Sequence, residues 1–176
     1  MNYILTDKEP KLPLKYFEDI SAIPHGSYNE KAISAFIADT AAKLGLYARV
    51  DERNNVVVKK PATPGYEHLP ALLLQANVVI KKPASPGCEH LDPVILQGHT
   101  DMVCEKNKNV EHDFTKDGIK LVVDGDILRA DGTTLGADDG KGVAYMLALM
   151  DSDSDTFPHP PLEFLFTTGE EVGFWG

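Results

Sequence analysis

The spacing of apolar residues in the first third of the chain predicts two helices followed by two strands. Within both helical stretches, apolar side chains recur every three or four residues, which gives each helix one face for a core. Pro24 stops the first helix, and Gly45 is a natural end for the second. The predicted helices carry their apolar residues at 13–23 and 33–44, and the predicted strands span 46–51 and 55–60.

A capping-box pattern, Ser27-Tyr-Asn-Glu30, precedes the second helix. In such a box the serine hydroxyl caps the first turn, and the glutamate three residues later binds back to the serine amide. We therefore expect Ser27 to be the N-cap of this helix. Up to residue 60 the chain is expected to be scaffold that takes no part in chemistry.

The chain contains an internal repeat. The segment Asn55–Leu69 recurs 22 residues later as Asn77–Leu91, and the similarity continues from Leu72–Gln75 to Val94–Gln97, so that residues 55–76 and 77–98 form a tandem repeat. Only the second copy runs on into Gly98-His-Thr-Asp101. Two copies indicate a local duplication and not a solenoid, which needs about three or more repeats. Because the shift is even, exchanging the copies preserves which side chains face the core, so the pattern does not decide which copy enters the sheet. The other copy must extend an edge, form an extra hairpin or loop out, and a spare apolar strand favours aggregation.

The second half of the chain alternates strands, turns and one helix. Asp124-Gly125 between two short apolar runs predicts a hairpin. A glycine-rich turn then leads into a largely apolar helix, and a strand of central character follows it. The expected elements are the hairpin strands 119–123 and 126–130, the helix 143–150 and the strand 162–168.

Three motifs with acidic residues lie at the ends of predicted elements. His99-Thr-Asp101 closes an apolar strand, Asp138-Asp139 precedes the last helix, and Glu170-Glu171 follows the last strand. Each motif alone has an ordinary explanation, such as a satisfied His–Asp pair, a helix cap or a solvated surface. Residues two apart in a strand share a face, and functional residues gather at strand ends in open sheets. Together the motifs predict a divalent-metal site.

Composition narrows the possible partners. The net charge of −10, without a long basic cluster, argues against nucleic acid, because phosphate binding requires a basic footprint. No apolar run reaches the ~20 residues of a membrane-spanning helix, and the N-terminus lacks the pattern of a signal peptide. Cys88 and Cys104 show no Cys-x-x-Cys spacing, which favours a reduced, cytoplasmic protein, with one disulfide as the alternative.

Four motifs together resemble the aminoacyl-histidine dipeptidases. The motifs are Gln97-Gly-His-Thr-Asp-Met-Val103, His112-Asp-Phe-Thr-Lys-Asp117, Gly132–Gly140 and Thr168-Gly-Glu-Glu-Val-Gly173. This peptidase D, or Xaa-His dipeptidase, branch is similar to carnosinase-like and carboxypeptidase G-like enzymes among the co-catalytic zinc metallopeptidases. The resemblance covers nearly the whole chain apart from the extra repeat copy. It implies an α/β catalytic domain, with a mixed sheet and helices on its faces, of phosphorylase/hydrolase-like type.

The resemblance also implies a role for each acidic motif. His99 matches a ligand of one zinc ion, and Asp101 matches the acid that orients this histidine. Asp138 matches the carboxylate that bridges two zinc ions, with cobalt or manganese as other possible metals. Glu171 matches a ligand of the second zinc ion, and Glu170 matches the general base. The implied reaction is hydrolysis of Xaa-His and other dipeptides by a metal-bridging water.

The family pattern includes further Asp and His ligands and a separate lid or dimerisation domain, for which residues 1–176 offer no match. We therefore expect residues 1–176 to be the N-terminal part of a truncated catalytic domain, in a family whose intact members form homodimers. Such a chain is expected to show little or no activity by itself. The alternative is a non-catalytic remnant or interaction fragment with at most weak binding of a single metal ion.

Overall fold

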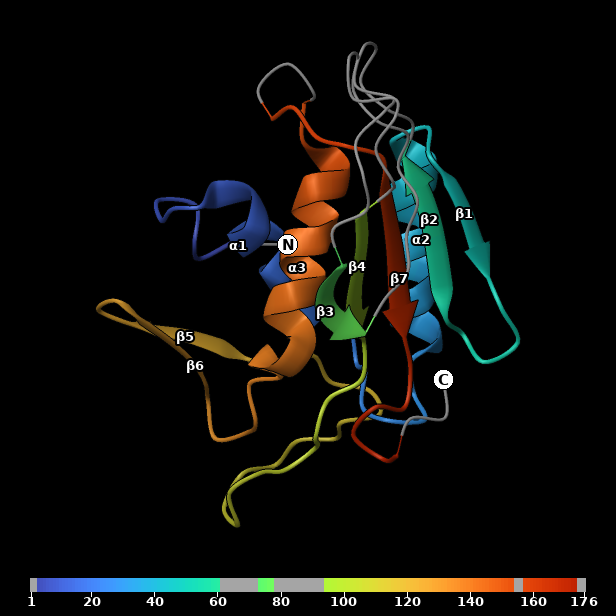
Figure 1. Cartoon of the computed structure of the whole chain (residues 1–176). Coiled ribbons are helices and arrows are strands. Elements are labelled where there is room, and N and C mark those ends of the chain that lie inside the picture. Colours follow the sequence, from blue (N-terminus) through green and yellow to red (C-terminus); the bar gives the residue numbers. More distant parts are fainter. Residues whose placement is uncertain (1–2, 61–72, 78–93, 154–156, 174–176) are drawn as a thin grey trace.

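A mixed, five-stranded sheet forms the centre of the fold, in the order β1-β2-β7-β4-β3, with a separate β5–β6 hairpin (Figure 1). The structure is a computed structural model that describes residues 3–60, 73–77, 94–153 and 157–173. The strands are β1 (Tyr47–Val50), β2 (Val56–Lys60), β3 (Leu73–Asn77), β4 (Val94–His99), β5 (Leu121–Asp124), β6 (Ile127–Ala130) and β7 (Leu162–Thr167). The helices are α1 (Lys11–Ser21), α2 (Lys31–Lys43) and α3 (Ala137–Asp151). The predicted α/β class and mixed sheet are confirmed.

The three helices share one apolar core with the sheet. Alternate residues of β2 and β7 point to the same face, and Val56, Val58, Phe164 and Phe166 on that face are 0% exposed. Helix α3 supplies Val143 and Leu147 to this core, and α2 supplies Ile33 and Ile37. The period-two pattern of the strands and the helical spacing predicted at sequence level thus meet in a single cluster.

Local stop signals determine several element ends. Gly45, with φ at +71°, donates its amide to the carbonyl of Ala42, and Leu46 donates to Ala41. This pair of bonds is the Schellman motif that commonly ends a helix, so the predicted end of α2 is confirmed. The Asp124-Gly125 turn likewise joins β5 to β6, with Gly125 at a φ of +61°.

The predicted capping box is wrong. Helix α2 begins at Lys31, and its N-cap residue Glu30 makes no side-chain cap bond. The hydroxyl of Ser27 instead donates to Asp101, and the carboxylate of Glu30 accepts the amide of Gly169. Tertiary partners have replaced the local partners that the pattern specifies.

The two repeat copies divide the sheet between them. Strand β2 comes from the first copy and pairs antiparallel with β7, whereas β4 comes from the second copy and pairs parallel with β7. The end of the first copy enters β3, which pairs parallel with β4 at the sheet edge. The edge position of β3 corresponds to edge extension, one of the three expected outcomes. The rest of the repeat lies outside the described residues, as does Cys88 of the alternative disulfide.

The parallel pairing of β4 and β7 places both carboxyl ends at one edge of the sheet, with His99 opposite Thr167. Helix α3 begins close to this edge, since Gly98 of β4 lies against Asp139 and Met146 of α3. Such an edge is where open α/β sheets carry their ligand sites. Among the described residues, no helix is long and apolar enough to cross a membrane.

Candidate metal centre

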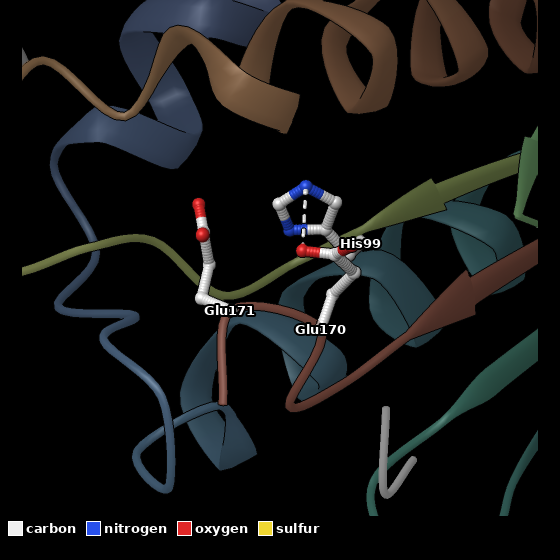
Figure 2. Close-up of side chains that lie close together, drawn as sticks. All are labelled: His99, Glu170 and Glu171. Atoms are coloured by element: carbon white, nitrogen blue, oxygen red, sulfur yellow. Dashed lines mark ion pairs between the residues drawn. The ribbon is translucent and has the colours of Figure 1, made fainter. Parts of the chain in front are cut away.

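Three side chains converge where the parallel strands β4 and β7 end. His99 is the last residue of β4, and Glu170 and Glu171 lie in the turn that follows β7. One possible ligand atom from each of the three lies within 4.8 Å of the others. Figure 2 shows the imidazole of His99 beside the carboxylate of Glu170, with Glu171 extending alongside. The parallel pairing of β4 and β7 brings these distant positions to one edge of the sheet.

The two ring nitrogens of His99 face different groups. Nδ1 lies 3.0 Å from the carbonyl oxygen of Asp101 and 3.5 Å from its carboxylate. Nε2 lies 3.2 Å from a carboxylate oxygen of Asp138 and 3.9 Å from one of Glu170. When Nδ1 donates its proton to Asp101, Nε2 is the nitrogen available to a metal ion.

Asp101 connects the histidine to the glutamate turn. Its carboxylate, in a residue only 1% exposed, accepts the backbone amides of Glu170 at 3.0 Å and Glu171 at 3.2 Å. The hydroxyl of Ser27 donates to the same carboxylate at 2.7 Å. One buried acid therefore fixes the position of both neighbouring motifs.

Titration at the site follows from this arrangement. Burial disfavours the charged form of His99, but bonds to the carboxylates of Asp101 and Asp138 outweigh it and raise the pKa to about 9. Burial opposes the charged form of Asp101 as well, yet bonds from His99, Ser27 and the two glutamate amides lower its pKa to about 2. Burial raises the pKa of Glu171, and neighbouring carboxylates add to this effect against the opposing charge of His99. Without a cation, an imidazolium balances part of the acidic charge.

The adjacent Asp138 and Asp139 have different surroundings. The side chain of Asp138 is 87% exposed and faces His99. Asp139 is more buried than Asp138, its carboxylate accepts the amide of Gly142 near the start of α3, and burial raises its pKa. Both residues have non-helical backbone angles inside the α3 range. One residue of the pair thus fits the metal interpretation and the other the helix-cap interpretation.

Comparison with known proteins shows that the chain is similar in sequence and in structure to dipeptidases. A cytosol non-specific dipeptidase from Escherichia coli is 37% identical over 172 residues, which cover 98% of this chain and 30% of that protein. The solved aminoacylhistidine dipeptidase from Vibrio alginolyticus is also 37% identical and has a TM-score of 0.80, over 98% of this chain and 30% of its own. The resemblance to the aminoacylhistidine dipeptidases is confirmed. The chain spans about 30% of the length of these relatives.

A second solved structure, a tripeptidase from Staphylococcus aureus, has a TM-score of 0.62 at 23% identity, over 92% of this chain and 37% of its own. At this identity the comparison shows the fold alone. No protein-family model matches the sequence.

All five residues to which the dipeptidase resemblance assigns a role lie at this one edge: His99, Asp101, Asp138, Glu170 and Glu171. Sequence reasoning missed two further residues there, Ser27 and Glu30. Their Ser-x-x-Glu spacing is explained completely by a helix cap, so the sequence carried no signal for a second role. Only the tertiary contacts reveal it.

Proposed function

We propose that this chain carries the metal site of a zinc-dependent dipeptidase that hydrolyses Xaa-His and other dipeptides. The cluster of His99, Glu170 and Glu171 at the carboxyl ends of parallel strands is the observation that carries the proposal. Similarity to two dipeptidases over 98% of the chain supports it. The Escherichia coli relative is named as a cytosolic enzyme, which supports the same location here.

The chemistry of the donor set fits a divalent cation. Imidazole nitrogen and carboxylate oxygen are ligands that zinc takes in proteins. Four carboxylates, from Asp101, Asp138, Glu170 and Glu171, surround a single imidazole, so the site holds more negative charge than His99 can balance. We assign His99, Asp138 and Glu171 as the ligands, with two zinc ions, or cobalt or manganese, as the cofactors.

We assign Glu170 to proton transfer and Asp101 to holding the ring of His99. A metal pair supplies polarisation of the peptide carbonyl and a lower pKa for the attacking water. We assign the carboxylate of Glu170, which lies 3.9 Å from Nε2 of His99, as the group that would accept a proton from that water. The same group can then deliver the proton to the leaving amine as the carbon–nitrogen bond breaks. Asp101 holds the ring of His99 by contact with Nδ1.

The resemblance implies two further ligands, an Asp and a His, which residues 1–176 do not supply. We therefore propose that the site binds metal but that this chain hydrolyses dipeptides slowly. The alternative function, an interaction fragment without catalysis, predicts no hydrolysis above that of free zinc.

Hydrolysis of an Xaa-His dipeptide, such as Ala-His, tests the catalytic assignment. The assay compares the chain with zinc, the Glu170→Gln variant with zinc, and zinc alone. We expect weak zinc-dependent release of histidine that Glu170→Gln abolishes. Hydrolysis that survives this substitution would contradict the role of Glu170, and fast turnover by the original chain would contradict the expected need for further ligands.

A further inference from the structure

The loop between α1 and α2 runs beside the two segments that carry the candidate metal site. Gly26 forms a parallel bridge with Met102, and the amide of Met102 donates to the carbonyl of His25 at 3.2 Å. This loop therefore adds a short strand-like contact just past the end of β4. The loop is distant in sequence from the residues it contacts, since Ser27 and Asp101 are 74 positions apart and Glu30 and Gly169 are 139 apart.

Two side chains from this loop reach one site segment each. The hydroxyl of Ser27 donates to Oδ2 of Asp101 at 2.7 Å. Oε1 of Glu30 accepts the amide of Gly169 at 3.1 Å, immediately before Glu170. Glu30 is 6% exposed, so this bond is shielded from water. Hydrogen bonds to charged acceptors in such places are among the stronger ones in proteins.

These contacts act on the same turn from two sides. The Oδ2 atom that accepts the hydroxyl of Ser27 also accepts the amide of Glu171, while Oδ1 accepts the amide of Glu170. Loss of the hydroxyl would free the carboxylate of Asp101 to rotate away from both amides. Loss of the carboxylate of Glu30 would release the turn at Gly169.

We propose that Ser27 and Glu30 are positioning residues that hold the Glu170-Glu171 turn at a fixed distance from His99. Neither side chain contacts a proposed ligand atom directly, so both act through Asp101 and Gly169. The effect of this positioning on metal binding rests on the proposed function. The positioning itself concerns the metal-free chain and is tested separately.

Amide hydrogen exchange of the metal-free chain measures the positioning. In Ser27→Ala we expect the amides of Glu170 and Glu171 to exchange about tenfold faster, because their acceptor is no longer held. Ser27→Thr keeps the hydroxyl and should restore slow exchange. The matched control is Ser34→Ala, which removes a buried hydroxyl that donates to the carbonyl of Asn54 at 2.6 Å and not to Asp101 or the glutamate turn.

For Glu30 the pair of variants is Glu30→Ala and Glu30→Gln. The glutamine keeps an acceptor oxygen for the amide of Gly169, so it should preserve slow exchange there, while alanine should not. Thermal melting of every variant shows whether the chain has folded. If Ser27→Ala leaves exchange of the turn unchanged, or if Ser34→Ala accelerates it equally, the positioning proposal is overturned.

Zinc titration of the same variants shows whether the positioning serves the site. Ser27→Ala should weaken zinc binding about tenfold, the usual size of an outer-contact effect, with Ser34→Ala unchanged. Zinc affinity that does not change in Ser27→Ala would overturn the link to the metal. A wild-type chain that binds no zinc would contradict the proposed function. The exchange data would still show whether Ser27 and Glu30 position the turn.

Discussion

Nε2 of His99 lies 3.2 Å from Oδ1 of Asp138, although the two residues are 39 positions apart in the chain. His99 comes from the end of β4, and Asp138 comes from the first turn of α3. The other ring nitrogen of His99 faces Asp101, so carboxylates contact the ring on both sides. The imidazole is therefore held in one orientation before any ligand arrives.

Metal binding should release protons, since a pKa of about 9 keeps His99 protonated at neutral pH. Below that pKa, zinc affinity should rise by about tenfold for each unit of pH, because zinc competes with one proton for Nε2. Calorimetric titration at pH 7, in buffers of different ionisation enthalpy, counts the protons released. A count of zero would show that His99 is not the group displaced.

The metal-free chain should lose stability towards both ends of the pH scale. The raised pKa of His99 means that its contribution is complete below the unfolded pKa of about 6.5 and disappears as the pH rises through about 9. The lowered pKa of Asp101 means the opposite, a contribution that is complete above about 4 and disappears as the pH falls through about 2.

Urea unfolding at pH 6 and pH 9 checks the alkaline half of this prediction. The free energy of unfolding of the original chain should fall over this interval by more than that of His99→Gln. Parallel losses in the two proteins would show that other groups cause the change.

Gly98 lies beside the site at a position with no room for a Cβ atom. A Cβ at this position would lie 2.6 Å from Oδ2 of Asp139 and 3.3 Å from Sδ of Met146. Gly98→Ala must therefore displace the carboxylate of Asp139, which accepts the amide of Gly142, and should destabilise the chain by about 1–3 kcal/mol. A control is Gly140→Ala, whose Cβ would lie 3.3 Å from the ring of Phe17 and 3.6 Å from Cδ1 of Ile20, without a contact under 3.0 Å. Urea unfolding should show the larger loss for Gly98→Ala, and equal losses would contradict the tight contact with Asp139.

Deleting one repeat copy tests what β3 contributes. Removal of residues 55–76 lets Asn77–Lys82 replace Asn55–Lys60 next to β7, with a single change of valine to isoleucine in that strand. Strand β4 and His99 keep their sequence. We expect a more cooperative melting transition and better solubility, because the spare edge strand is gone. A lower melting temperature would instead show that β3 stabilises β4 by pairing with it.

Features with local causes could be predicted from the sequence. The helix end at Gly45 and the hairpin turn at Asp124-Gly125 depend on glycine backbone angles that the sequence specifies directly. The convergence of the His99 and Glu170 motifs followed from the rule that functional residues gather at strand ends. The structure brings these motifs together as that rule predicts.

Features that depend on competition between partners could not be predicted. Ser27 and Glu30 match a local cap, yet buried partners from other segments bind them instead. The different environments of Asp138 and Asp139 arise from their non-helical backbone angles at the start of α3, which composition does not determine. The division of the repeat between β2 and β4 was equally undetermined, because both copies carry the same alternation.

The central claim, that His99 is part of a zinc site, is tested most directly by zinc titration of the original chain and of His99→Ala. The control is Asp126→Asn, which removes the charge of an exposed acid in the β5–β6 turn. The claim predicts saturable zinc binding that weakens by at least about tenfold in His99→Ala and is unchanged in Asp126→Asn. Equal affinity of the original chain and His99→Ala would contradict it.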